Sequence, residues 1–169
     1  MVGPHATAIL VTTPQGKFAV PVEDQYVGKS LRFTGQYSEG ELQILQQICS
    51  RETRLLVVGA HIGALAIPLA RSCRAVVAIE ANPEIVELLR WNVELNKLTN
   101  CTVLHKAASD RIETLDFLVS RTNSGGSKRV PAVKDPEQFE LVLQEMCTKG
   151  EGDAGLIFTK HSAAQVRFG

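Results

Sequence analysis

Three short segments carry residues whose spacing could bind a small cofactor. The first is the glycine loop, defined as Gly59–Gly63, in which Gly59 and Gly63 enclose Ala60 and His61 directly after an apolar run. Glycine permits a sharp turn and a close ligand approach, and a helix beginning at Gly63 would offer free N–H groups to a carboxylate. His61 stands where the dinucleotide fingerprint requires glycine. The loop therefore favours a nucleoside ligand without phosphates and disfavours an NAD-dependent oxidoreductase.

The second segment is Glu80-Ala81-Asn82, which follows the apolar run Ala75–Ile79. An acidic residue at the end of this strand of a doubly wound sheet accepts hydrogen bonds from ribose hydroxyls. The alternative interpretation is a solvated glutamate beside a turn that packing alone requires.

A third segment, Ala107-Ala108-Ser109-Asp110, follows the next predicted strand. Its small residues would let an adenine ring lie against the backbone, with Asp110 near the exocyclic amine, although an ordinary helix cap or turn would have the same composition. The ligand that fits all three segments is S-adenosylmethionine, which has an amino-acid end, a ribose and an adenine.

The reaction expected of this cofactor is in-line transfer of its sulfonium methyl group to an acceptor oxygen, with the thioether as leaving group, and it is driven mainly by proximity and alignment. A base would help to remove the hydroxyl proton. His61 and Glu39 are the candidates, and His61 is favoured for shaping the loop instead. Beyond these two candidates, the sequence assigns no catalytic residue. It assigns no metal ligand either, because its cysteines and histidines lack the spacing of zinc ligands.

The elements that position these residues alternate between strand and helix. Strands are predicted at Arg54–Val58, Ala75–Ile79 and Thr102–His105, and helices at Gly63–Arg71 and from Pro83, with Asn82 as cap, to about Asn96. This alternation is typical of a parallel sheet. Downstream, a strand or helix is expected at Ile112–Val119, a helix at Pro136–Thr148 or a strand at Phe139–Leu143, and a last strand at Gly155–Thr159.

The segment before this unit predicts a β-hairpin, a loop and a helix. Apolar runs Ala8–Thr12 and Lys17–Val22 enclose a turn at Gly16. Asp24–Gly40 is interpreted as mostly loop, and a capping box at Ser38 and Glu41 begins a helix. The apolar face of that helix is expected to comprise Leu42, Leu45, Ile48 and Cys49.

The predicted fold is therefore α/β, a Rossmann-like and mostly parallel sheet with flanking helices behind a hairpin and capping helix. Residues 1–50 would pack on the cofactor-binding domain 51–169 as one compact unit, with an atypical C-terminal part. The chain after the glycine loop is short for a full doubly wound sheet, so an incomplete sheet is expected, and a partner or homodimer would be one way to complete it.

Composition excludes several classes of protein. The chain has 169 residues, 44% of them hydrophobic, and its 18 Lys plus Arg balance 18 Asp plus Glu. The balance gives no support to a nucleic-acid partner, and no apolar run would span a membrane. We expect no signal peptide. The four cysteines are interpreted as buried side chains in a reducing cytoplasm.

As a set, the motifs resemble the FkbM-type methyltransferases, a branch of the Rossmann-like S-adenosylmethionine-dependent enzymes. The resemblance covers roughly residues 16–131. It rests on VGAHIG at 58–63, IEANP at 79–83 and LRWNVELN at 89–96, with the lead-in segments 24–31 and 35–41 and the later segments 107–110 and 123–127. It implies O-methylation of a hydroxyl on a sugar or natural-product-like small molecule. The alternative is a truncated or inactive domain that binds S-adenosylmethionine or a nucleotide.

Overall fold

The computed structural model describes residues 3 and 5–108, and beyond them five strands. The elements up to residue 108 are β1 (Ala8–Thr13), β2 (Gly16–Pro21), α1 (Val27–Thr34), α2 (Glu39–Ile48), β3 (Arg54–Val58), α3 (Ala66–Ala70), β4 (Ala75–Glu80), α4 (Pro83–Leu95) and β5 (Cys101–His105). The later strands are β6 (Thr114–Ser120), β7 (Lys128–Arg129), β8 (Phe139–Glu145), β9 (Gly155–Thr159) and β10 (Ser162–Val166).

A five-stranded sheet in the order β10-β9-β3-β4-β5 forms the centre of the fold. β4 runs parallel to β3 and to β5, and β9 runs parallel to β3 on its other side, while β10 pairs antiparallel with β9. The predicted α/β class with a mostly parallel sheet is confirmed. β6, β7 and β8 form a separate antiparallel sheet that the sequence did not predict.

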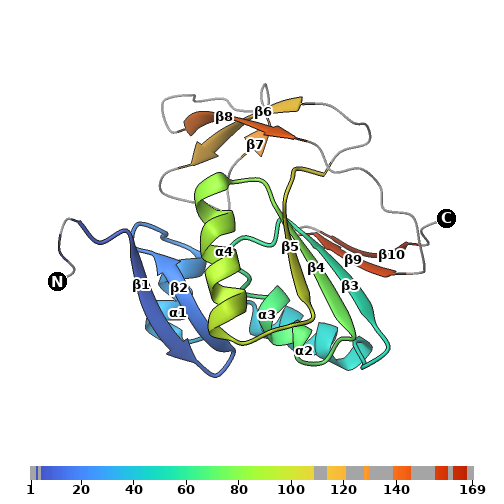
Figure 1. The fold of residues 1–169 in the computed structure, drawn as a ribbon. Coiled ribbons are helices and arrows are strands. Elements are labelled where there is room, and N and C mark those ends of the chain that lie inside the picture. Colours follow the sequence, from blue (N-terminus) through green and yellow to red (C-terminus); the bar gives the residue numbers. More distant parts are fainter. Residues whose placement is uncertain are drawn as a thin grey trace.

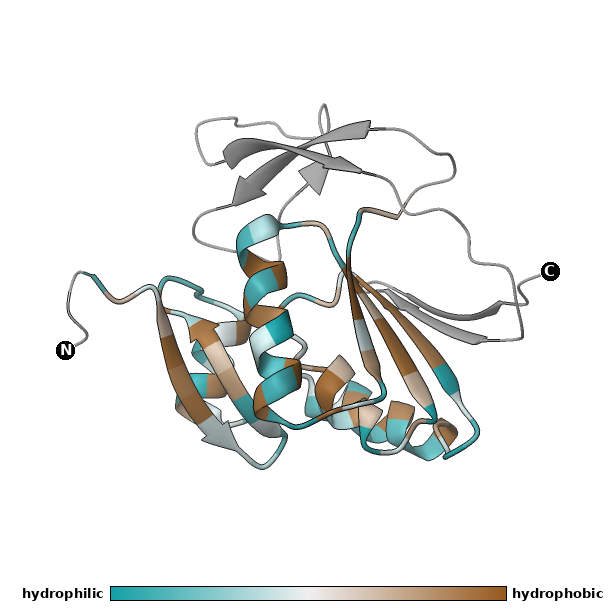
Figure 2. Cartoon of the chain, in the orientation of Figure 1, coloured by the Kyte–Doolittle hydropathy of each residue, from teal (hydrophilic) through white to brown (hydrophobic). Residues whose placement is uncertain are grey.

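The sequence of the central strands explains their position. β3 and β4 are runs of Leu, Val, Ile and Ala with neighbours on both sides, as in parallel strands that are covered on both faces. Figure 2 shows these strands in the hydrophobic colour, whereas α4 carries hydrophilic residues along its outer side. Leu55, Val57, Val76 and Ala78 are buried in the main hydrophobic cluster.

The predicted start of α4 is confirmed in detail. The Asn82 side chain accepts hydrogen bonds from the N–H groups of Glu84 at 3.0 Å and Ile85 at 3.4 Å, and Pro83 occupies the first helical position. α4 lies between the hairpin and the sheet (Figure 1). Its buried side chains include Ile85, Leu89 and Val93, and Leu88 packs against the cluster from its edge.

Two expectations for the lead-in segment are wrong. Asp24–Gly40 is not mostly loop, because α1 occupies its middle and ends at Gly35, which has φ 70°. The capping box does not form either. Ser38 precedes α2 in the left-handed conformation, with φ 47° and no side-chain capping bond, so its hydroxyl is not aimed at the N–H of Glu41.

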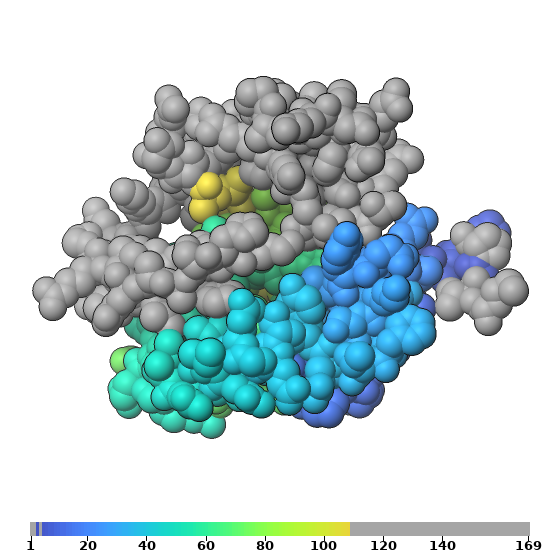
Figure 3. Space-filling view, turned by 180° about the vertical axis from the view of Figure 1, so that it is seen from behind, coloured from blue at the N-terminus to red at the C-terminus, as the bar shows by residue number. Residues whose placement is uncertain are grey.

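The helices of the lead-in segment nevertheless pack on the core. Leu31 of α1 and Leu42 and Leu45 of α2 are buried, and Cys49 follows them at the end of α2, whereas Ile48 stays exposed. Figure 3 shows α1 and α2 covering a continuous part of the face that is hidden in Figure 1. In the part of the chain that the structure describes, no helix has the length and apolar character of a membrane span.

The N-terminal hairpin forms as predicted, with Thr13 paired to Gly16 at the turn. Gly16 has φ 149°, which suits glycine. α4 then covers the hairpin: the Asn92 amide bonds to the backbone of Ala19, and the Asn96 amide bonds to the backbone of Lys17. The hairpin is thereby attached to the helix that follows Glu80.

Candidate functional site

The glycine loop lies where a ligand site is expected in this topology. β3 is the first strand of the sheet in chain order, and the sheet continues to β4 on one side and to β9 on the other. Such a reversal of strand order is a switch point, and ligands bind there at the carboxyl ends of the strands. The loop connects that end of β3 to α3.

Gly59 turns the chain out of β3 and leaves space beside it. Its φ is 72°, and among the residues that the structure describes, no atom lies within 4 Å of a Cβ built on it. The N–H groups of Gly59 and Ala60 both donate to the carbonyl of Ile79, each at 2.9 Å, so the loop is fixed to the end of β4. Glycine is required here by conformation, and the open side of the backbone can accept a ligand.

Gly63 has a different role. Its φ is 87°, and a Cβ would come within 2.8 Å of both Ile67 Cδ1 and Leu89 Cδ1. The glycine therefore lets α3 and α4 pack closely over the loop. The close contact is with a side chain of each helix, Ile67 of α3 and Leu89 of α4.

The predicted helix start at Gly63 is wrong. α3 is only five residues long, from Ala66 to Ala70. The N–H of Gly63 donates to the Ala60 carbonyl at 2.9 Å in a turn, so it is not directed at a ligand. Pro68 is tolerated as the third residue of α3, because the first N–H groups of a helix lack intrahelical partners anyway. Turns therefore continue from the glycine loop to Leu65.

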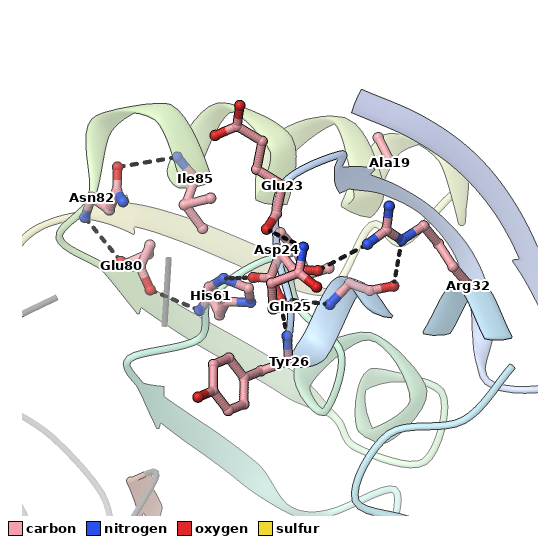
Figure 4. A network of polar contacts seen from close by, with 12 residues as sticks. Ala19, Glu23, Asp24, Gln25, Tyr26, Arg32, His61, Glu80, Asn82 and Ile85 are labelled. Carbon is pink, nitrogen blue, oxygen red and sulfur yellow. Dashed lines mark hydrogen bonds and ion pairs between the residues drawn. The ribbon is translucent and has the colours of Figure 1, made fainter. Parts of the chain in front are cut away.

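His61 adopts the backbone conformation that the fingerprint glycine would have allowed. Its φ is 53° and it is buried, with 7% of its surface exposed. A non-glycine residue in this region costs about 1–3 kcal/mol and persists only where its surroundings fix it. Its N–H donates to Oε2 of Glu80 at 2.7 Å, and its Nε2 lies 3.4 Å from Oδ2 of Asp24 (Figure 4).

Glu80 is placed at the end of β4 as predicted. Its other carboxylate oxygen, Oε1, accepts the N–H of Asn82 at 2.9 Å, and the residue is 8% exposed. The carboxylate thus joins the glycine loop to the start of α4. Each oxygen accepts one backbone N–H and has a second lone pair, which a ribose hydroxyl could use.

Asp24 is the site residue that sequence analysis missed. It is 1% exposed, and its Oδ1 accepts the N–H groups of Tyr26 at 2.8 Å and Gly28 at 3.0 Å, while Oδ2 faces His61. The sequence signal that could have revealed it was an aspartate four residues before a glycine, Asp24 and Gly28, in a segment that was predicted to be loop. An aspartate that bonds the N–H groups two and four residues ahead is a common local turn.

The other predicted site residues are distributed unevenly. Ala81 links Glu80 to Asn82, and its carbonyl lies 3.0 Å from Nε2 of His105. Ala108 is exposed just after β5. Ser109 and Asp110 lie outside the described residues. Glu39 lies exposed in the first turn of α2, where its Oε1 is 3.5 Å from Nε2 of Gln43.

Tyr37 lies between the hairpin and this network. Burial raises the pKa of its phenol; a hydrogen bond with the Ser38 side chain lowers it, and the charges of Glu41 and Asp24 raise it further. Its backbone N–H and carbonyl both pair with the Gln15 amide, at 3.0 and 3.1 Å. The phenol therefore stays protonated and uncharged at neutral pH beside the buried Asp24 carboxylate.

Comparison with known families identifies this arrangement. Residues 32–121, more than half of the chain, match the TRM5/TYW2 methyltransferase domain. The match spans α2, the glycine loop, Glu80, α4 and β5. The chain belongs to the TRM5/TYW2 methyltransferase domain family. The predicted methyltransferase domain is thus confirmed.

The sequence similarity to individual curated relatives covers only part of each protein. This chain is 37% identical over 116 residues to an uncharacterized RNA methyltransferase of Gloeobacter violaceus. The alignment covers 64% of this chain and 24% of the Gloeobacter protein. The chain spans 18% to 24% of the curated relatives that it matches.

Two solved structures are similar at lower identity. One is M. jannaschii TYW2 in complex with AdoMet, with a TM-score of 0.49, 21% identity, and coverage of 67% of this chain and 55% of that one. The other is aTrm5 in complex with tRNALeu, with a TM-score of 0.48, 23% identity, and coverage of 61% and 29%.

The family corrects two expectations. The FkbM-type resemblance is wrong, because the matching domain is TRM5/TYW2. The glycine loop, Glu80 at the end of β4 and the capped α4 all lie inside the matched residues 32–121. The expected small-molecule acceptor, with nucleic acid excluded, is also contradicted, because the Gloeobacter relative is an RNA methyltransferase. A net charge of zero does not describe how charge is distributed over a surface.

Proposed function

We propose that this chain is the S-adenosylmethionine-dependent methyltransferase domain of an RNA-modifying enzyme. The observation that carries the proposal is the TRM5/TYW2 match over residues 32–121, because it includes both the glycine loop and Glu80. The RNA methyltransferase of Gloeobacter supports RNA as the acceptor class.

The residues at the carboxyl ends of β3 and β4 fit this cofactor. The open space at Gly59 would let a ligand approach the backbone of the loop. Each carboxylate oxygen of Glu80 accepts one backbone N–H and can accept one more hydrogen bond. When bound, S-adenosylmethionine supplies an activated methyl group on a sulfonium centre. We assign Glu80 to the ribose hydroxyls, the glycine loop to the amino-acid end and the segment after β5 to the adenine.

The chain's own contribution is to bind and orient. Glu80 is fixed by two backbone N–H groups before any ligand arrives, so little ordering is required on binding. In a displacement reaction, such fixed placement of the two reactants accounts for a large part of the acceleration. His61 and Glu39 stay predictions as candidates for moving a proton.

Transfer of a labelled methyl group tests the proposal. The protein is incubated with S-adenosylmethionine carrying a tritiated methyl group and with transfer RNA, ribosomal RNA fragments or a panel of glycans. We expect label in an RNA fraction, loss of that label in Glu80→Ala, and retention in Glu94→Ala, which removes an exposed acid from α4. Label in glycans alone would contradict RNA as the acceptor class.

The alternative function is an inactive domain that binds S-adenosylmethionine without transferring its methyl group. Cofactor binding without label in any acceptor would favour it. The expected cytoplasmic location and the expected partner or homodimer stay predictions.

A further inference from the structure

His61 is held on two sides by buried carboxylates from different parts of the chain. Its backbone N–H meets Glu80, which comes from β4, and its side chain meets Asp24, which lies between β2 and α1. Figure 4 shows the three residues in one row, with His61 in the middle. The left-handed conformation of His61 is thus fixed both through its main chain and through its ring.

The backbone contact depends on that conformation. The direction of an N–H group follows from the dihedral angles of the chain around it, so a His61 residue that relaxed to negative φ would redirect its N–H. Glu80 would then lose the 2.7 Å bond that fixes Oε2. The ring contact with Asp24 opposes this relaxation, because it anchors the side chain of the same residue.

Asp24 is itself held rigidly enough to serve as an anchor. Oδ1 accepts the N–H groups of Tyr26 and Gly28, and the Asp24 carbonyl accepts from Nη2 of Arg32 at 2.9 Å. Arg32 also donates to the carbonyl of Val22 at 2.7 Å. Gly28 leaves room for this arrangement, since a Cβ there would lie 3.0 Å from Cβ of Asp24.

The two oxygens of Asp24 therefore have separate tasks. Oδ1 organises the start of α1, and Oδ2 faces the imidazole. Capping the helix explains the first oxygen alone. A buried carboxylate that only capped α1 would not require its second oxygen to be directed at the glycine loop.

We propose that Asp24 is a positioning residue for the cofactor site: its carboxylate fixes the His61 ring and so keeps the His61 N–H on Glu80. The inference rests on the proposed function, because it assigns Glu80 to the cofactor. It makes the segment before the sheet part of the binding site, although Asp24 does not touch the ligand.

Asp24→Asn separates the two tasks. The amide oxygen can still accept the N–H groups of Tyr26 and Gly28, while the group facing His61 changes from an acceptor to a donor. We expect the Kd for S-adenosylmethionine, measured by calorimetry, to rise about tenfold. Glu23→Gln is the matched control, because it removes the charge of an exposed neighbour, and its Kd should stay within twofold of wild type.

A double-mutant cycle excludes a purely structural role. If Asp24 acts through His61, the double variant Asp24→Asn/His61→Ala binds the cofactor no more weakly than the weaker single variant. His61→Gln retains a side-chain donor for Asp24, so it should restore most of the affinity that His61→Ala loses. Fully additive losses, or an unchanged Kd in folded Asp24→Asn, would overturn the inference. If Asp24→Asn does not fold, the comparison of His61→Gln with His61→Ala decides it.

The amide resonance of His61 gives a readout without cofactor. Its short bond to a carboxylate should shift the amide proton downfield, and Asp24→Asn should move it upfield while Glu23→Gln leaves it in place. An unmoved resonance in Asp24→Asn would contradict the positioning role. If wild type fails to bind S-adenosylmethionine, the proposed function is wrong, and this resonance still decides whether Asp24 controls the His61–Glu80 contact.

Discussion

Asn92 and Ala19 exchange two hydrogen bonds across the boundary between α4 and the N-terminal hairpin. The Asn92 Oδ1 accepts the Ala19 N–H at 2.6 Å, and its Nδ2 donates to the Ala19 carbonyl at 3.1 Å. One turn later, Asn96 repeats the pattern on Lys17, at 3.0 and 2.7 Å. Residues four apart on a helix rise by about 6 Å, close to the roughly 6.6 Å between alternate residues of a strand. The amides of Asn92 on α4 and of Asn96 at its C-terminal cap can therefore pair with the edge of β2.

Asn92→Ala should destabilise the protein strongly. Asn92 is fully buried, and its Nδ2 also donates to the Ile62 carbonyl at 2.9 Å, so the change leaves several buried backbone groups without partners. We expect the free energy of unfolding in urea to fall by about 3 kcal/mol. Asn96→Ala is the control: its contacts with Lys17 are exposed, and the expected loss is about 1 kcal/mol. Equal losses in the two variants would show that burial of the amide is not what matters.

The two glycines of the loop should respond differently to alanine. In Gly63→Ala, the new Cβ meets Ile67 and Leu89 at 2.8 Å in addition to the unfavourable φ, so unfolding in urea should become easier by about 3 kcal/mol. Gly59→Ala has only the conformational cost, about 1–2 kcal/mol.

The same glycine variants should differ in cofactor binding. Gly59→Ala places a methyl group in the open space beside the backbone, so its Kd for S-adenosylmethionine should rise more than that of folded Gly63→Ala. Calorimetry on both variants at a temperature where each is folded measures this. A stronger effect at Gly63 would move the ligand away from Gly59.

The thiols of Cys73 and Cys101 should be unreactive in the native protein. Burial raises the pKa of Cys73 to about 12, with further contributions from the neighbouring Cys49, and burial raises that of Cys101 to about 11. Iodoacetamide attacks the thiolate. At pH 8 we expect peptides containing Cys73 and Cys101 to stay unmodified in the native protein and to react in urea, as measured by mass spectrometry. Rapid native labelling of Cys73 would contradict its burial.

The same shift predicts alkaline destabilisation. The ordinary thiol pKa of 9.0 rises to about 12 for Cys73 in the folded state, so the folded state retains a proton that the unfolded chain releases. The stability from this group is complete below pH 9 and is lost as the pH rises toward 12. Unfolding free energies of wild type and Cys73→Ala between pH 8 and 10 should converge as the pH rises.

The strands and helices from β3 to β5 were predicted well, because each of them has its own local sequence signal. β3 was predicted with its exact bounds, and Asn82 with Pro83 marked the start of α4. α1 was missed because Gly28 and Gly35 indicated a loop; Gly28 instead gives room to Asp24, and Gly35 ends the helix. The contact between Asp24 and His61 joins distant segments, so no local pattern could reveal it.

The acceptor could not be predicted for a related reason. The residues that identify a cofactor lie in short motifs at strand ends, and Gly59, His61 and Glu80 are brought together as expected. Acceptor choice depends on surfaces outside those motifs. The resemblance therefore led to a methyltransferase but to the wrong branch, and the zero net charge gave no indication of the RNA acceptor that we propose.

Calorimetric titration of S-adenosylmethionine into wild type and Glu80→Ala tests most directly whether the glycine loop and Glu80 form the cofactor site. We predict saturable binding to wild type at one site and a loss of about 1–3 kcal/mol in Glu80→Ala. Circular dichroism confirms that the variant is folded. Absence of binding to wild type at high micromolar cofactor, or an unchanged Kd in folded Glu80→Ala, would contradict a cofactor site at these residues.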